Sequence, residues 1–193
     1  MSRTSSTQSI LRHWRDAVPN DRLAHLVKDA TRALVRALQM RLAEHVVSFG
    51  HWTFLRILWE GDGLTQRELS EQAGVMEPTT FSALKAMERL GYISRRRRGG
   101  DRKKSYILLT LKGRLLRDRL VPLAEEVNGI AVRGVRKADI AATRGVLLAV
   151  IENLARDEHV ADMRMPSTRE LAQLRAGKRK RKSSKRTRLA EPR

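Results

Sequence analysis

The most chemically distinctive stretch of the chain is RRRRGGDRKKSYILLT, which begins at Arg95. Seven of its side chains are cationic against the single carboxylate of Asp101, and cations at this density bind phosphate groups. Two glycines between basic arms, followed by residues of high strand propensity, are typical of a β-hairpin. The sequence therefore predicts a hairpin over residues 94–105 with a positively charged tip, a shape that can contact DNA. The alternative is an ordinary solvated charge run, which usually lacks a following strand and turn.

Residues that support catalysis or hold a metal ion do not form a recognisable set. The histidines have no HExxH or other metal-ligand spacing, and no serine lies in a GxSxG motif. An enzyme that acts on nucleic acid would need acidic metal ligands in a cleft, but Asp62, Asp101 and Asp157 are scattered over predicted turns and helix ends. We therefore expect no enzymatic activity, no metal site and no cofactor.

The composition points to a polyanionic partner. Lys and Arg number 40 against 21 Asp and Glu, a formal net charge of +19 over 193 residues. No apolar run is long enough to span a membrane and no signal-peptide pattern opens the chain, so we expect a cytoplasmic protein without a membrane partner. The absence of cysteine excludes disulfides and thiolate metal sites.

The charge is concentrated at the C-terminus. Residues 164–193 carry twelve Lys or Arg and two Glu, a net charge of +10. This segment has no hydrophobic period and repels itself, so we expect residues 161–193 to be a disordered basic tail. The tail can add nonspecific phosphate contacts or serve only solubility.

Hydrophobic periodicity predicts six helices that must position these groups. The first runs from Asp21 to about Val47, and the second starts with Ser48 as N-cap and stops at Gly61. In LTQREL, Thr65 and Glu68 form a capping box with Leu64 and Leu69 as a hydrophobic staple, and this helix ends near Gly74. The others span residues 77–90, residues 111 to about 127 with Thr110 as cap and a kink possible at Pro122, and residues 137–157.

Two short helices joined by a turn that contains Gly match a helix-turn-helix, and the hairpin after them is then its wing. The three longer helices carry apolar stripes too extensive to stand alone, and burial against a second copy would cover them. We predict a mainly α protein with a small β-wing, in which a winged helix-turn-helix joins a helical dimerisation layer in a homodimer.

The chain resembles the MarR family of bacterial transcriptional regulators. The segments that carry the resemblance are HWTFLRILWEGDGLTQRELSEQAGV, MEPTTFSALKAMERLGYI and DRKKSYILLTLKGR, within residues 21–157. The resemblance implies a dimeric winged helix-turn-helix protein, often a repressor that a small ligand releases from DNA. We divide the chain into a leader (1–20), a helical dimerisation region (21–47 and 111–160), a DNA-binding domain (48–110) and the tail (161–193).

The recognition helix over residues 77–90 is expected to enter the major groove. Successive side chains on a helix advance by about 100°. If Thr80, Leu84 and Met87 face the core, the side chains on the opposite side of the helix face DNA. The groove candidates are Pro78, Thr79, Ser82, Lys85 and Arg89. For any one of the last three, an ordinary solvated helix face is an equal alternative. Thr65 and Gln66 are candidates for phosphate contacts, although Thr65 as a purely structural cap is the stronger single interpretation.

The wing is expected to enter the minor groove, where arginine at a hairpin tip fits the enhanced negative potential. Alternate strand residues face opposite sides, so only some cations can reach the duplex. The resemblance matches Asp101 and Arg102 to the family's acidic-basic wing pair. The wing candidates are Arg95, Arg97, Arg98, Arg102 and Lys103.

A regulator also needs an input. In the resembled family small molecules, often aromatic acids, bind between the winged unit and the helical layer. His45, His51, Trp52 and Arg56 lie near the junction of the first two helices and offer donors, a cation and an aromatic wall for an aromatic acid or acyl-CoA effector. The alternative for Trp52 is plain core and for Arg56 a solvated side chain.

The leading hypothesis is a dimeric repressor that binds a pseudo-palindromic operator. Its alternative is a nonspecific architectural, nucleoid-type DNA-binding protein, driven by charge and the basic tail. The ratio of specific to nonspecific affinity separates the two, since charge alone supplies only the nonspecific part.

Overall fold

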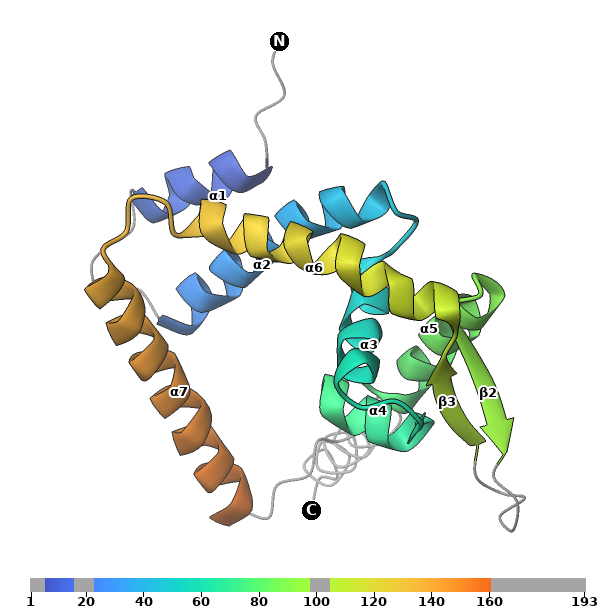
Figure 1. Ribbon diagram of the computed structural model, residues 1–193. Helices are drawn as coiled ribbons and strands as arrows, with labels where there is room; N and C mark the ends of the chain where they lie inside the picture. Colours follow the sequence, from blue (N-terminus) through green and yellow to red (C-terminus); the bar gives the residue numbers. More distant parts are fainter. Residues whose placement is uncertain (1–5, 16–22, 98–104, 161–193) are drawn as a thin grey trace, which may run out of the picture. The chain divides into compact units, whose positions relative to one another are not determined.

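The structure is a computed structural model that describes residues 6–15, 23–97 and 105–160. It is mainly helical with a small antiparallel sheet, as the sequence predicted. The chain forms two compact units that divide between Arg133 and Gly134. The first contains α1 to α6 and the sheet, and the second contains α7 (Lys137–Val160) (Figure 1). The division into four functional segments remains a prediction.

Helices α2 (Leu23–Ala43) and α6 (Leu111–Ala131) pack against each other in the first unit (Figure 1). An ion pair of 2.8 Å between Arg41 and Glu126 joins them, and its hydrogen bond lowers the pKa of Glu126. Helix α6 continues through Pro122 as one element. α2 ends before the predicted Val47 because residues 44–46 form a turn, in which Val46 has a φ of 60°.

The sequence correctly located the starts of the next two helices. Ser48 caps α3 (Phe49–Glu60), and its hydroxyl accepts from the His51 amide at 3.1 Å. Thr65 caps α4 (Gln66–Ala73): its hydroxyl accepts from the Glu68 amide at 3.3 Å, while the Glu68 carboxylate accepts from the Thr65 amide at 2.7 Å. Gly74 ends α4 in the left-handed region, with a φ of 60°.

Helix α5 (Glu77–Arg89) follows directly, with Pro78 in its first turn. Thr80, Leu84 and Met87 are fully buried, as predicted from their shared face. These three side chains hold α5 against a core that α3, α4 and the sheet also line. The core residues are Leu38, Leu42, Val47, Trp52, Phe54, Leu55, Leu58, Leu69, Leu84, Met87, Tyr92, Ile93, Ile107, Leu109, Leu116, Leu120 and Val127.

The sheet has the order β1-β3-β2, with β1 (Leu64–Thr65), β2 (Ile93–Arg97) and β3 (Ser105–Leu109). In the antiparallel β2–β3 hairpin, Ile93 pairs with Leu109 and Arg97 with Ser105, which confirms the predicted wing strands. Neither β1 nor α1 (Ser6–Arg15) was predicted from the sequence; β1 has only two residues, too few to show a period.

Helix α7 stands in the second unit, and its apolar side chains are exposed. Among its described side chains, residues 137–157, none is buried. Val146, Leu148, Ile151 and Leu154 are all more than half exposed. No helix in the part of the chain that the structure describes is long and apolar enough to cross a membrane.

Candidate nucleic-acid interface

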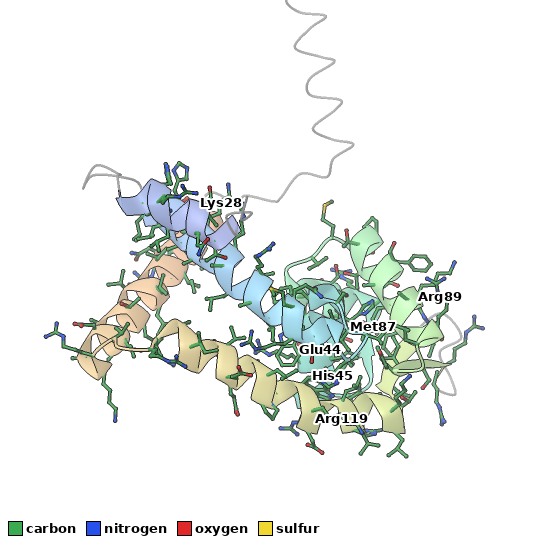
Figure 2. The ribbon with its side chains drawn as sticks, turned by 90° about the horizontal axis from the view of Figure 1, so that it is seen from above. Lys28, Glu44, His45, Met87, Arg89 and Arg119 are labelled. Atoms are coloured by element: carbon green, nitrogen blue, oxygen red, sulfur yellow. The ribbon has the colours of Figure 1, made fainter. Side chains whose placement is uncertain are left out.

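The outward face of α5 carries the five groove candidates. Pro78, Thr79, Ser82, Lys85 and Arg89 are all exposed, opposite the buried Thr80, Leu84 and Met87. Figure 2 shows Arg89 on the outer side of α5 and Met87 on the side that faces the rest of the unit. The Ser82 hydroxyl donates to the Pro78 carbonyl of the same helix at 3.0 Å, so its hydrogen bond is made within α5 when no DNA is bound. Lys85 and Arg89 have no carboxylate partner within the described ranges, which leaves two cations available to an anion.

The start of α4 is held by its own capping box. The Thr65 hydroxyl accepts from the Glu68 amide and donates to the Glu68 carboxylate at 2.8 Å. Its structural role is therefore visible in the geometry, whereas a phosphate contact remains a prediction. Gln66, the first residue of α4, is partly exposed at the same helix end, where free amides favour an anion.

The arginines in the described part of the wing differ in their contacts and exposure. Arg95 is partly buried: its Nε donates to Glu88 of α5 at 3.1 Å, and its guanidinium lies 5.7 Å from the ring centroid of Phe81. Arg96 and Arg97 are exposed towards the wing tip. Arg98, Arg102 and Lys103, with Asp101, lie outside the described residues. Arg95 thus joins the wing to α5.

A carboxylate that sequence reasoning did not select organises the base of the wing. Asp62 accepts from the backbone amides of Leu109 at 2.9 Å and Gly63 at 3.0 Å, and it pairs with Arg114 at 2.9 Å. Arg114 also donates to the Leu109 carbonyl at 3.0 Å. This network fixes the end of β3 and the start of α6 to the loop before β1.

Close backbone packing holds the start of α6 against the wing. A Cβ at Gly113 would lie 2.0 Å from the Tyr92 carbonyl oxygen, so no larger residue fits there without movement. The Gly113 carbonyl accepts from the Trp59 indole at 3.0 Å. The Thr110 hydroxyl caps α6 through the Gly113 amide and donates to the Gly91 carbonyl at 2.6 Å. The base of the wing, at Gly91 and Tyr92, is therefore tied to the start of α6.

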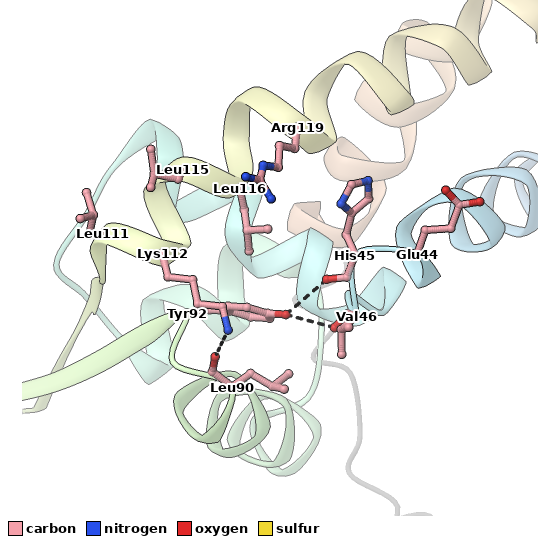
Figure 3. A pocket seen from close by; sticks show the side chains of 10 residues that line it. All are labelled: Glu44, His45, Val46, Leu90, Tyr92, Leu111, Lys112, Leu115, Leu116 and Arg119. Atoms are coloured by element: carbon pink, nitrogen blue, oxygen red, sulfur yellow. Dashed lines mark hydrogen bonds between the residues drawn. The ribbon is translucent and has the colours of Figure 1, made fainter.

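Two pockets in the first unit contain three of the four effector candidates. The larger, about 550 Å³, lies between α6 and the turn that carries His45 and Val46 (Figure 3). The Tyr92 hydroxyl donates to the carbonyls of His45 at 3.4 Å and Val46 at 3.3 Å, and burial raises the pKa of Tyr92. Lys112 and Arg119 line this pocket from α6 and Glu44 lines it from the turn, so the lining carries two cations and one carboxylate.

Trp52 and Arg56 line the smaller pocket, about 380 Å³, with Arg117. The rings of Trp52 and Trp59 meet edge to face at 5.7 Å, and Trp52 is itself buried core. His51 is not among the residues that line either pocket. Its Nδ1 accepts from the Ser48 amide at 3.5 Å in the α3 cap, and burial lowers its pKa. The structure therefore does not bring the four candidates together in one pocket, and their ligand role remains a prediction.

Comparison with known proteins agrees with this architecture. The family model of MarR matches residues 47–105, which run from just after the turn that follows α2 to the first residue of β3. The chain is 31% identical over 111 residues to the HTH-type transcriptional regulator TtmR of Methylorubrum extorquens, a match that covers 58% of this chain and 57% of that one. It thus spans little more than half the length of this relative.

A second relative is the homoprotocatechuate degradative operon repressor of Escherichia coli, 28% identical over 107 residues, covering 55% of this chain and 72% of the repressor. Among solved structures, a MarR-family regulator from Listeria monocytogenes complexed with 26mer DNA superposes with a TM-score of 0.65 at 24% identity, over 76% of this chain and 99% of that one. The relatives are regulators and not enzymes, which confirms that prediction.

Proposed function

This chain belongs to the MarR family of transcriptional regulators, and we propose that it is a sequence-specific repressor that binds a pseudo-palindromic operator as a homodimer. The observation that carries the proposal is the exposed face of α5, where Lys85 and Arg89 have no carboxylate partner in the described part of the chain and Arg95 of β2 is paired with Glu88 of the same helix. We place α5 in the major groove and the wing in the minor groove, on double-stranded DNA in the cytoplasm. The regulator of similar fold from Listeria was solved with DNA.

The exposed apolar surface supports the homodimer. On α2, Leu23, Leu26, Val27 and Leu34 are between 36% and 51% exposed, and α7 has a comparable apolar stripe. Apolar surface on this scale marks an interaction site in a soluble protein. A second copy offers the same helices and buries both stripes. The pseudo-palindrome follows, because a two-fold protein places one α5 in each half-site.

We propose the larger pocket as the effector site. Its volume suits an aromatic acid, and Lys112 and Arg119 can pair with a carboxylate while His45 and Tyr92 supply polar and aromatic surface. The E. coli relative is named as the repressor of an operon that degrades an aromatic compound. Trp52 and Arg56 make the smaller pocket a second candidate. A panel of aryl carboxylates and acyl-CoA thioesters tests both, with melting temperature and DNA affinity as readouts in Arg119→Ala and Arg56→Ala.

The comparisons do not favour a nonspecific architectural role, and one measurement separates the two functions. Duplexes are selected from a random pool, and the best is compared with a shuffled duplex of equal composition by fluorescence anisotropy over a salt series. We expect a preference on the order of a thousandfold or more at physiological salt. Equal affinity for both duplexes, falling together with salt, would overturn the proposal in favour of charge-driven binding.

A further inference from the structure

Phe81 is an apolar ring exposed on the helix that we place in the major groove. It lies on α5, and 49% of its surface is exposed. At 100° per residue it stands on the flank of the outward face that Lys85 also borders, four residues further along the helix. A single exposed aromatic is unremarkable on most surfaces. Here it borders a face of polar and cationic groups.

The ring is held in place from the wing side. The Arg95 guanidinium lies over it at 5.7 Å, within the range of a cation–π contact. Glu88 of the same helix fixes that guanidinium through the ion pair of 3.1 Å. Phe81, Glu88 and Arg95 therefore form a braced set in which α5 supplies the ring and the carboxylate and β2 supplies the cation. A ring held in this way presents its free surface outward at little cost in side-chain entropy.

The major groove offers one apolar group, the C5 methyl of thymine, and phenylalanine is one of the side chains that contacts it. We propose that Phe81 reads the methyl group of a thymine in each operator half-site. This inference rests on the proposed function, since it requires α5 to lie in the groove. Phe81 would then discriminate at one base pair where Ser82 and Lys85 make polar contacts, and Arg95 would act as a positioning residue for the ring.

The rival explanation is that Phe81 serves only to position Arg95. Both roles predict weaker DNA binding when the ring is removed, so affinity alone does not separate them. Replacing thymine with uracil does, because it deletes the methyl group and leaves the base pair and the phosphates unchanged. A brace is indifferent to that deletion.

The test uses the full chain and the duplex of highest affinity from the random-pool selection. Each thymine of both half-sites is replaced by uracil in turn, and dissociation constants are measured by anisotropy for the wild type and Phe81→Ala. In the wild type we expect one symmetric position at which uracil weakens binding about fourfold per half-site, the effect of one buried methyl group. In Phe81→Ala the same replacement should change affinity less than about twofold, which is the scatter expected for two changes that do not interact.

Phe81→Leu guards against a general effect of the alanine variant, since it retains apolar contact and should keep part of the uracil effect. Leu111→Ala, which removes an exposed apolar side chain at the start of α6, should keep all of it. Equal melting temperatures confirm folding. A Phe81→Ala loss that is identical on thymine and uracil duplexes would overturn the methyl contact and leave sequence-specific binding intact. Failure to select any preferred duplex would overturn both proposals.

Discussion

The segment from Ser48 to Gly113 and helix α7 differ in how they satisfy their apolar side chains. The first buries Leu55, Leu58, Leu69 and Leu84. Side-chain caps fix its helix starts, and the hydrogen bonds of Asp62 hold the loop before β1. Helix α7 exposes Val146, Leu148, Ile151 and Leu154. The segment from Ser48 to Gly113 thus buries its apolar side chains in the core that it shares with α2 and α6, whereas those of α7 stay exposed within one chain. We propose that a second copy covers them.

Among the substitutions that test this difference, Gly113→Ala should have the largest effect on stability. The new methyl would lie 2.0 Å from the Tyr92 carbonyl oxygen, and backbone cannot yield as a flexible side chain does. We expect a loss of about 3 kcal/mol in the free energy of unfolding, measured with urea. Gly129→Ala on the same helix has nothing within 4 Å of the new Cβ and should gain up to about 1 kcal/mol through helix propensity. Equal effects of the two would contradict the close packing.

On the other side of the contrast, Leu147→Glu with Ile151→Glu should disrupt assembly without unfolding the first unit. Both side chains are exposed on one face of α7, so the monomer loses little. We expect the dissociation constant of the dimer, measured by sedimentation equilibrium, to rise about a hundredfold or more, because the new carboxylates would be buried without partners in the dimer. Ala142→Glu with Ala149→Glu places the same charges on the opposite face and should leave the dimer intact. Dissociation in both pairs alike would refute a specific α7 contact.

Asp62→Ala sharpens the contrast at the base of the wing. It removes the acceptor of the Leu109 amide, and a partly buried amide without a partner costs about 2 kcal/mol. The ion pair with the exposed Arg114 adds little. Thermal unfolding should show the loss, while Asp118→Ala, at an exposed position on α6, should be neutral. A neutral Asp62→Ala would mean that the wing base is held by other contacts.

The smallest effect concerns His51. Burial lowers its pKa in the folded state, so the unfolded chain takes up a proton first as pH falls. Stability present above the unfolded pKa of about 6.5 is then lost as pH falls through the lower folded value. His51→Gln, which keeps a capping-box residue at this position, should remove this part of the pH dependence. Denaturant midpoints between pH 7 and pH 5 measure it, and parallel slopes in the two proteins would argue against a buried neutral imidazole.

The sequence predicted the features that depend on neighbours along the chain. Ser48 and Thr65 as caps, Thr80 and Met87 as core, and the hairpin strands all follow from local spacing and propensity. Contacts between separate elements could not be predicted, because no pattern of neighbouring residues indicates them. They are the Asp62–Leu109 hydrogen bond, the Gly113–Tyr92 contact and the Glu88–Arg95 ion pair. The proposed effector residues His45 and Trp52 are close in sequence but line different pockets, because His45 lies in the turn after α2 whereas Trp52 lies on α3.

The central claim is that two copies of the chain bind one operator as a dimer. Its most direct test is the mass of the complex on the selected duplex, measured by sedimentation equilibrium at physiological salt. We predict two chains per duplex, with one half-site covered by each. The Leu147→Glu and Ile151→Glu protein should lose this complex at the same concentration. A single chain bound with undiminished affinity, or chains that coat the duplex in proportion to its length, would contradict the dimeric operator-binding regulator.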